Sequence, residues 1–163
     1  STDIRTRLEY YRDLGRGFDL KVQLEHDFQL EDSITTRVPQ PGQLLAPLSS
    51  KENLDRNLGD YTEYDIGFGK TLGNWRIGAA WHRYEKDHDA YHSRIGTNTS
   101  ILEANTDVFI NQWQATLSWS GLDAWKSGKV PIPMVVQLNI QDTYRAKNFP
   151  DLSDVSLQLT GFF

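Results

Sequence analysis

Four histidines are the side chains best suited to acid–base or metal chemistry in this chain of 163 residues, which contains no cysteine. The lack of cysteine removes disulfides, thiolate metal ligands and thiol nucleophiles. The pattern of the chain would place His82 opposite Asp65 on a neighbouring strand, as an oriented acid–base pair. Acyl transfer would also need a serine beside them, and Ser118 and Ser120 belong to another predicted strand. We therefore expect a structural ion pair at His82 rather than a catalytic one.

A second group of candidate ligands lies in one predicted loop, where Asp87, His88, Asp89 and His92 follow closely on one another. Carboxylates and imidazoles in such a set could hold a divalent ion. A solvated polar loop accounts for the same residues without a metal. The remaining histidine, His26, only interrupts an apolar series. We predict no catalytic residue, no metal site and no cofactor.

Period-two alternation dominates the chain and predicts an all-β fold. From Phe18 to Leu30 the apolar residues fall on one parity and the charged or amide residues on the other, which is typical of a strand. Only 50–58 could form a short helical turn. The same sorting predicts strands at about 3–13, 18–30, 60–72, 75–88, 106–120, 132–146 and 153–163.

Two hairpins predict their own registers. A three-residue turn at 14–16 would set Leu8 opposite Val22, with opposite charges facing one another on the other side. A two-residue turn directly after Leu72 would set that residue opposite Trp75. A slip of one residue would place apolar against charged side chains in both hairpins. The pattern thus predicts an antiparallel meander.

The predicted connections are unequal in length. The first and third strands end in tight turns, whereas long loops at about 32–59 and 89–105 follow the second and fourth. Short turns at one end and long loops at the other are typical of transmembrane β-barrels. The whole chain, 1–163, is expected to be a single β-barrel domain or the C-terminal part of one.

Composition narrows the class of protein further. An aromatic content of 12% and a net charge of −5 argue against a disordered chain. An isoelectric point near 5.3 gives no support for nucleic-acid binding. No run approaches the ~20 apolar residues of a membrane helix. A mean hydropathy of −0.57 beside five tryptophans is the unusual feature.

A sheet with one apolar and one polar face fits two kinds of β protein. In a soluble barrel or sandwich the apolar face is the core and could bind a hydrophobic ligand, whereas in a transmembrane barrel it meets lipid. Aromatic residues near the strand ends favour the membrane, because Phe109 and Trp119 would be on the order of 25 Å apart along the membrane normal. The expected lipid-interface aromatics are Tyr10, Trp75, Phe109, Trp119 and Phe163.

The end of the chain resembles the C-terminal strand of Gram-negative outer-membrane β-barrels. Val155, Leu157, Leu159, Gly161 and Phe163 share one face, and a terminal aromatic closing such a series characterises that family. Gly161 departs from the pattern, since the family usually carries an aromatic there. The resemblance implies an up-and-down transmembrane barrel in the bacterial outer membrane, with membrane lipid and the outer-membrane assembly machinery as partners.

The strand count raises a problem of parity, because bacterial single-chain barrels normally have an even number of strands. Three explanations stay open. An eighth strand lies within 32–58 or 90–105, or the chain is the C-terminal part of a larger barrel, or several chains form one barrel as a homo-oligomer. We favour the second, since neither long loop alternates cleanly.

The last hairpin also resembles a narrower group of barrels. A proline-led strand from Pro131, an acidic residue at Asp142 and the run Asn148-Phe149-Pro150 are similar to barrels of the phenol-degradation meta pathway and to channels that export functional amyloid. This resemblance implies a larger barrel with a transport role.

These expectations combine into a channel for passive or export transport of polar solutes or polypeptide. One alternative is the soluble barrel described above. Another is an outer-membrane enzyme acting on lipid, although the residues around the adjacent His92 and Ser93 do not match the phospholipases or lipid A deacylases. We favour the channel and expect no enzyme. The predicted pore-lining residues are Arg5, Arg7, Glu9, Lys21, Glu25, Asp27, Glu63, Asp65, Arg76, His82, Gln112, Gln114, Gln137, Asn139 and Gln158.

Overall fold

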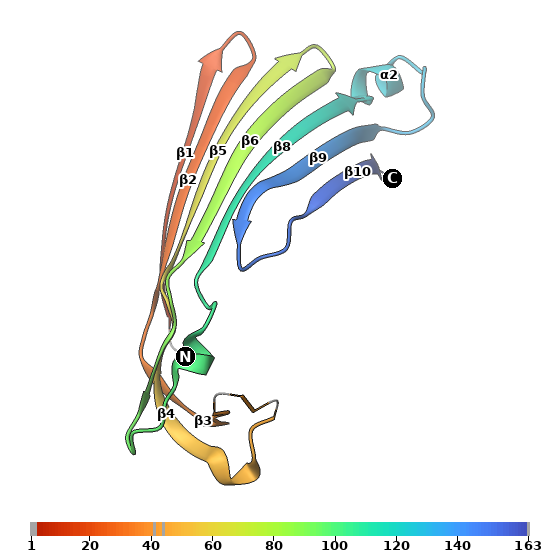
Figure 1. The fold of residues 1–163 in the computed structure, drawn as a ribbon. Helices are drawn as coiled ribbons and strands as arrows, with labels where there is room; N and C mark the ends of the chain where they lie inside the picture. The colour runs from red at the N-terminus through yellow and green to blue at the C-terminus, as the bar shows by residue number, and fades with distance from the viewer. Residues whose placement is uncertain (1–2, 41, 44, 163) are drawn as a thin grey trace.

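A computed structural model describes residues 3–40, 42–43 and 45–162 of the chain. In this part the protein is all-β, with two antiparallel sheets. The main sheet has seven strands in the order β1–β2–β5–β6–β8–β9–β10 and is not closed into a barrel (Figure 1). Its strands are β1 (Asp3–Gly15), β2 (Phe18–Gln29), β5 (Tyr61–Leu72), β6 (Trp75–Lys86), β8 (Val108–Ser120), β9 (Met134–Lys147) and β10 (Ser153–Gly161).

A smaller sheet, which we call the loop sheet, lies at the end of the main sheet opposite the tight turns (Figure 1). Its strands are β3 (Asp32–Arg37), β4 (Lys51–Asn57) and β7 (Ala90–Ser93), in that order. The described residues also contain three short helical segments: η1 (Leu48–Ser50), α1 (Ser100–Glu103) and α2 (Leu122–Lys126). None of these helices is long and apolar enough to cross a membrane.

The sequence predicted the main sheet closely. All its strands lie within two residues of the predicted bounds, and consecutive ones pair antiparallel. The hairpin β5–β6 has the predicted register, with Leu72 opposite Trp75 and Asp65 opposite His82. The reason is local, because the two-residue loop Gly73-Asn74 leaves only one way to pair the flanking residues.

The register predicted for the first hairpin is wrong by two residues. Leu8 faces Leu24 instead of Val22, because the turn consists of Arg16 and Gly17 and the register shifts between Asp13 and Gly15. Arg16 and Gly17 both have positive φ, 54° and 79°, as a tight two-residue hairpin turn requires. A shift of two residues keeps each side chain on its predicted face.

The helical turn considered at 50–58 is wrong, and neither long loop adds an eighth strand to the main sheet. The segment 50–58 forms strand β4, apart from its first and last residue, and not a helical turn. The first long loop also contains β3 and the second contains β7, but these strands pair with β4 and add no eighth strand to the main sheet. Pairing between two distant loops leaves little trace in a local pattern.

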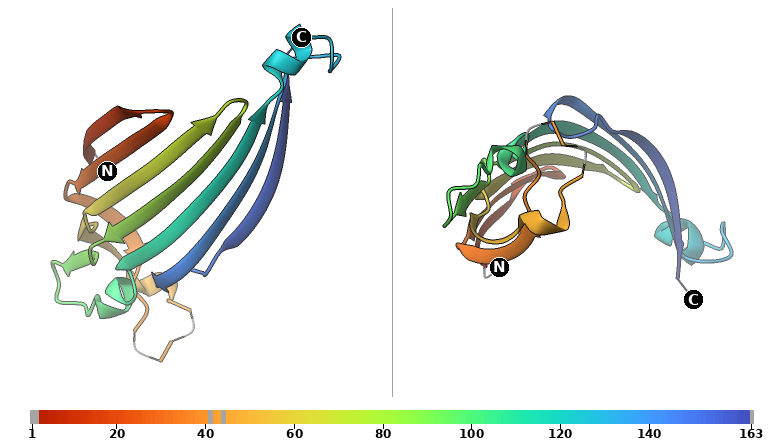
Figure 2. Two further views of the ribbon diagram at one scale, coloured as in Figure 1. Left: turned by 90° about the horizontal axis from the view of Figure 1, so that it is seen from above. Right: turned by 60° about the horizontal axis from the view of Figure 1, so that its bottom comes forward.

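The main sheet is curved into an arch (Figure 2). Its two faces differ in polarity. On the polar parity Asp19 is only 8% exposed and Asp27 only 1%. On the apolar parity Ile77 is 52% exposed and Leu157 is 74% exposed. Side chains crowd together on the concave side of a curved sheet, so we infer that the polar parity faces the concave side. The usual polarity of a protein interior is inverted here.

Candidate functional site

The polar face of the main sheet begins with a network of charged side chains on β1, β2 and β5. Asp27 accepts hydrogen bonds from Arg5 Nε (2.7 Å) and from the Tyr61 hydroxyl (2.7 Å). Arg5 also donates to the Tyr61 oxygen (2.5 Å) and lies 3.2 Å from Glu25. Arg7 pairs with the other oxygen of Glu25 at 3.2 Å. The two buried carboxylates of this network, Asp27 and Glu25, are thus neutralised by arginines of the neighbouring strand β1.

A second ion pair on this face spans an intervening strand. Arg76 on β6 binds Asp19 on β2 through two bonds, of 2.5 and 2.7 Å, although β5 lies between them. The pair lies over Gly69 of β5, where a Cβ atom would come within 2.3 Å of an Arg76 nitrogen. The missing side chain therefore makes room for the bidentate contact. We call this surface, from β1 to β6, the charged half.

The other half of the polar face, on β8, β9 and β10, consists of amides and hydroxyls, and we call it the amide half. Gln112 donates to the Thr143 hydroxyl (2.9 Å) and accepts from Gln141 (3.0 Å). Asn139 accepts from both Thr116 (3.0 Å) and Gln137 (2.8 Å). These neutral side chains form hydrogen bonds with one another along and across the strands, so the network carries no net charge.

Between the two halves the polar face is hollowed. One hollow of about 240 Å³ is lined by Asp65, His82 and the amides Gln112, Gln114 and Gln141. A second, of about 310 Å³, extends along Lys21, Gly67, Gly78 and Arg76 toward the tight turns. Small residues at the centre of the sheet create this space. The arrangement suits a hydrated polar molecule, since carboxylate, imidazole and amide groups line the first hollow.

The structure brings His82 and Asp65 together, with 2.8 Å between Nδ1 and Oδ1, but neither Ser118 nor Ser120 lies beside the pair. His82 is opposite Gln112, whereas Ser118 is opposite Arg76, six residues further along β8 and about 20 Å away. Ser120 lies two residues beyond Ser118 on the same strand. The hydroxyl of Ser93, the third serine considered, donates to Glu52 and lies in the loop sheet. None of the three serines lies beside the His82–Asp65 pair.

The four loop residues considered as metal ligands have different neighbours in the structure, and the backbone amide of Asp87 donates to the Asp60 carbonyl (2.8 Å). Asp89 pairs with Lys86 and accepts from the Gly59 amide (2.8 Å), while His88 lies 3.4 Å from the Thr106 hydroxyl. His92 faces Asp55 across the loop sheet. No cluster of three or more potential ligands occurs among the residues that the structure describes.

The remaining predicted pore-lining residues also lie on the polar face. Glu9 is half exposed and lies 3.1 Å from Arg7. Lys21 is exposed and forms no ion pair with a described residue. Glu63 is opposite Glu25 and Tyr84, and Gln158 on the edge strand is exposed opposite Gln137.

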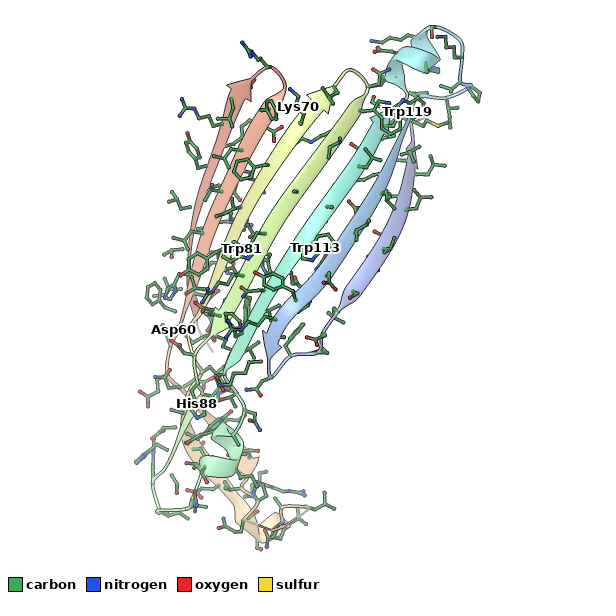
Figure 3. The ribbon with its side chains drawn as sticks, turned by 45° about the horizontal axis from the view of Figure 1, so that its top comes forward. Asp60, Lys70, Trp81, His88, Trp113 and Trp119 are labelled. Carbon is green, nitrogen blue, oxygen red and sulfur yellow. The ribbon has the colours of Figure 1, made fainter. Side chains whose placement is uncertain are left out.

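The predicted interface aromatics lie on the apolar face, except that Phe163 falls outside the described residues. Trp75 and Trp119 face one another beside the tight turns, with Tyr10 on β1 47% exposed. Trp81 and Trp113 form a second cross-strand pair further along the sheet (Figure 3). Phe109 lies beyond that pair.

Sequence reasoning missed several residues of the polar network. Asp19, Tyr61 and Thr143 each bind a predicted residue but were not themselves predicted. All three lie on the polar parity, which is a signal the sequence carries. Their partners could not be read in the same way, because the Asp19–Arg76 contact reaches across a third strand. Gly69, a glycine at a polar-parity position, is the only local sign of it.

The loop sheet has a different kind of polar surface. Hydrogen bonds from Arg94 hold the pKa of Asp55 below its usual range, and those from Arg56 lower the pKa of Asp32. The hydroxyls of Ser93 and Thr97 lower the pKa of Glu52. Asp55 and Glu52 thereby tie the two long loops to one another, whereas Asp32 joins β3 to β4 within the first loop.

Comparison with known proteins found no similar protein. No family model matches the chain, and neither curated protein sequences nor solved structures contain a significant match.

Proposed function

We propose that the main sheet is part of the wall of a transmembrane β-barrel in the bacterial outer membrane, and that its polar face lines a path for polar solutes or polypeptide. The inverted polarity of the sheet carries this proposal. Only Val38, Leu54 and Ile110 are buried apolar residues in the described part of the chain; Leu54 belongs to the loop sheet and Val38 directly follows its strand β3.

The exposed apolar face needs a cover. Burial of apolar surface contributes about 25 cal/mol per Å², and a continuous exposed patch of this extent is rare in soluble monomers. Ile77, Leu117 and Leu138 form one apolar row across adjacent strands of this face. Lipid chains can pack against a smooth, convex, apolar sheet because, unlike a protein partner, they need no complementary shape.

The polar face supports the same proposal from the opposite side. A soluble sheet that kept this face in water would not need Asp27 at 1% exposure, bound by three side chains. In a barrel the concave face surrounds an aqueous interior, where paired charges and amide ladders remain hydrated. The charged half and the amide half would then form opposite walls of the pathway.

Barrel closure sets a condition on the remaining strands. β1 and β10 are the edges of the main sheet and run in the same direction, because five strands alternate between them. Antiparallel closure therefore requires an odd number of further strands, since antiparallel neighbours alternate in direction around a barrel.

Extraction and conductance test the proposal. The full-length protein should fractionate with the outer membrane, require detergent to remain dispersed, and conduct ions when inserted into a planar bilayer. A protein that is soluble and monomeric without detergent would contradict the barrel. A protein that requires detergent but never conducts ions would be consistent with the barrel and would contradict the solute pathway.

A further inference from the structure

A basic and aromatic cluster interrupts the apolar face toward the long loops. Arg83 on β6 is opposite Asn111 on β8, and Asn111 is opposite Arg145 on β9, two residues beyond the Trp81–Trp113 pair. The guanidinium carbons of Arg83 and Arg145 lie 4.9 and 5.3 Å from the centre of the Phe109 ring. Two cations therefore share one aromatic ring on the face that we propose to meet lipid.

Polar atoms of this cluster are buried without partners. Asn111 is 7% exposed, and its Oδ1 accepts no hydrogen bond. Arg83 Nε is buried and donates none, although the end of that guanidinium pairs with Glu85. Arg145 is exposed and forms no ion pair with a described residue. A buried donor and a buried acceptor left unpaired are costly, so the cluster lacks a molecule that offers both.

We infer that this cluster binds the phosphate-bearing headgroup of a membrane lipid. The inference rests on the proposed function, because it requires the apolar face to meet a bilayer. Charged residues on the lipid face are destabilising at the bilayer midplane and tolerated near the interface, which places the cluster at headgroup level. Headgroup phosphates are the anions found at that level.

The chemistry of the headgroup matches the atoms of the cluster. Arginine binds phosphate through two parallel hydrogen bonds, which Arg145 has free to offer. A second phosphate oxygen can accept from Arg83 Nε, and a hydroxyl or ammonium of the same headgroup can donate to Asn111 Oδ1. Phe109 would then lie against the first carbons of the lipid. Inorganic phosphate would satisfy only part of this set.

Lipid binding by the full-length protein tests the inference. Native mass spectrometry in a neutral detergent would compare a short-chain phosphatidic acid with the diacylglycerol of the same chains. The wild-type protein should retain the phosphatidic acid at least tenfold more tightly. Arg145→Gln should weaken its binding about tenfold, and Arg145→Lys should weaken it less, because lysine keeps the charge and loses the two-point contact.

A matched control separates a site from diffuse attraction. Arg37 is an exposed arginine on β3, in the loop sheet, and Arg37→Gln makes the same change of charge. It should bind the phosphatidic acid as the wild type does. Equal losses in Arg37→Gln and Arg145→Gln would overturn the inference, as would unchanged binding in Arg145→Gln. Displacement of the lipid by equimolar inorganic phosphate would identify a site for free anions instead.

Different results contradict the barrel and the lipid site. A protein that is soluble without detergent contradicts the barrel itself. A protein that requires detergent and conducts ions, but whose Arg145→Gln variant binds phosphatidic acid normally, contradicts only the lipid site.

Discussion

The main sheet and the loop sheet bury opposite kinds of side chain, although both are antiparallel and belong to the same chain. In the loop sheet Leu54 is fully buried and the Arg94 side chain is 65% exposed. In the main sheet Asp27 is 1% exposed and Ile77 is 52% exposed. Overall composition cannot explain this difference. The difference is the one expected if the loop sheet lies in water and the apolar face of the main sheet meets lipid, as we propose.

The largest expected effect is on the apolar contact at the centre of the loop sheet. Leu54→Ala should destabilise that sheet by roughly 2–5 kcal/mol, because it leaves a cavity where a leucine was fully buried. Hydrogen exchange of the β3, β4 and β7 amides measures the loss. Leu45, which is 87% exposed, provides the control. If Leu45→Ala causes the same loss, the loop sheet has no ordinary core and the comparison fails.

A charge placed on the apolar face of the main sheet comes next. Leu117 is 39% exposed in the middle of β8, and Leu117→Arg should cost about 2–4 kcal/mol in a bilayer. In water a half-exposed position tolerates arginine within about 0.5 kcal/mol. Reversible urea unfolding in lipid vesicles measures the difference, with Leu45→Arg as the matched change. Equal stabilities of the two variants would place the apolar face in water.

Removal of a carboxylate distinguishes the ion pairs of the two sheets. Asp27→Ala should cost about 2 kcal/mol, because it removes the shared acceptor of Arg5 and Tyr61. Asp55→Ala, which breaks a surface pair with Arg94, should have little effect on global unfolding. The same urea titration measures both. A greater loss of stability in Asp55→Ala than in Asp27→Ala would contradict this prediction.

The smallest expected effect is a response of the loop sheet to acid. Arg94 lowers the pKa of Asp55, and the Ser93 and Thr97 hydroxyls lower that of Glu52. A depressed pKa stabilises the fold above the value in the unfolded chain, about 3.9 for Asp and 4.3 for Glu, and this stability is lost as the pH falls through the folded value. The protection factors of the β4 and β7 amides, which compare the observed exchange rate with the intrinsic rate at the same pH, should fall below about pH 4. In Arg94→Gln this fall should be smaller, and an unchanged profile would exclude Asp55 as its source.

Local patterns predicted what local geometry decides. The turn at Gly73-Asn74 allowed the register of β5–β6 to be predicted residue by residue, including the Asp65–His82 contact. The first hairpin was predicted two residues out of register, because the extra residue before Arg16 resembles part of a longer turn. The predicted face of each side chain is nevertheless correct, since alternation has a period of two and the error is two residues.

Contacts between distant segments were beyond this kind of prediction. The pairing of β4 with β7 joins two loops that show no alternation, and it became visible only in three dimensions. The same holds for Asp19 and Arg76, which meet across Gly69 from strands that are not neighbours. Arg83 and Arg145 likewise meet at Phe109 only because β6 and β9 both flank β8.

The sequence by itself determined which residues share a face, because neighbouring side chains of a strand point to opposite sides whatever lies beyond the strand. It thereby separated an apolar from a polar surface along the whole main sheet. Only the tertiary structure decided that the polar surface is the crowded one and the apolar surface the exposed one. Curvature and ion-pair partners result from the packing of several strands together, and alternation within one strand carries no information about either.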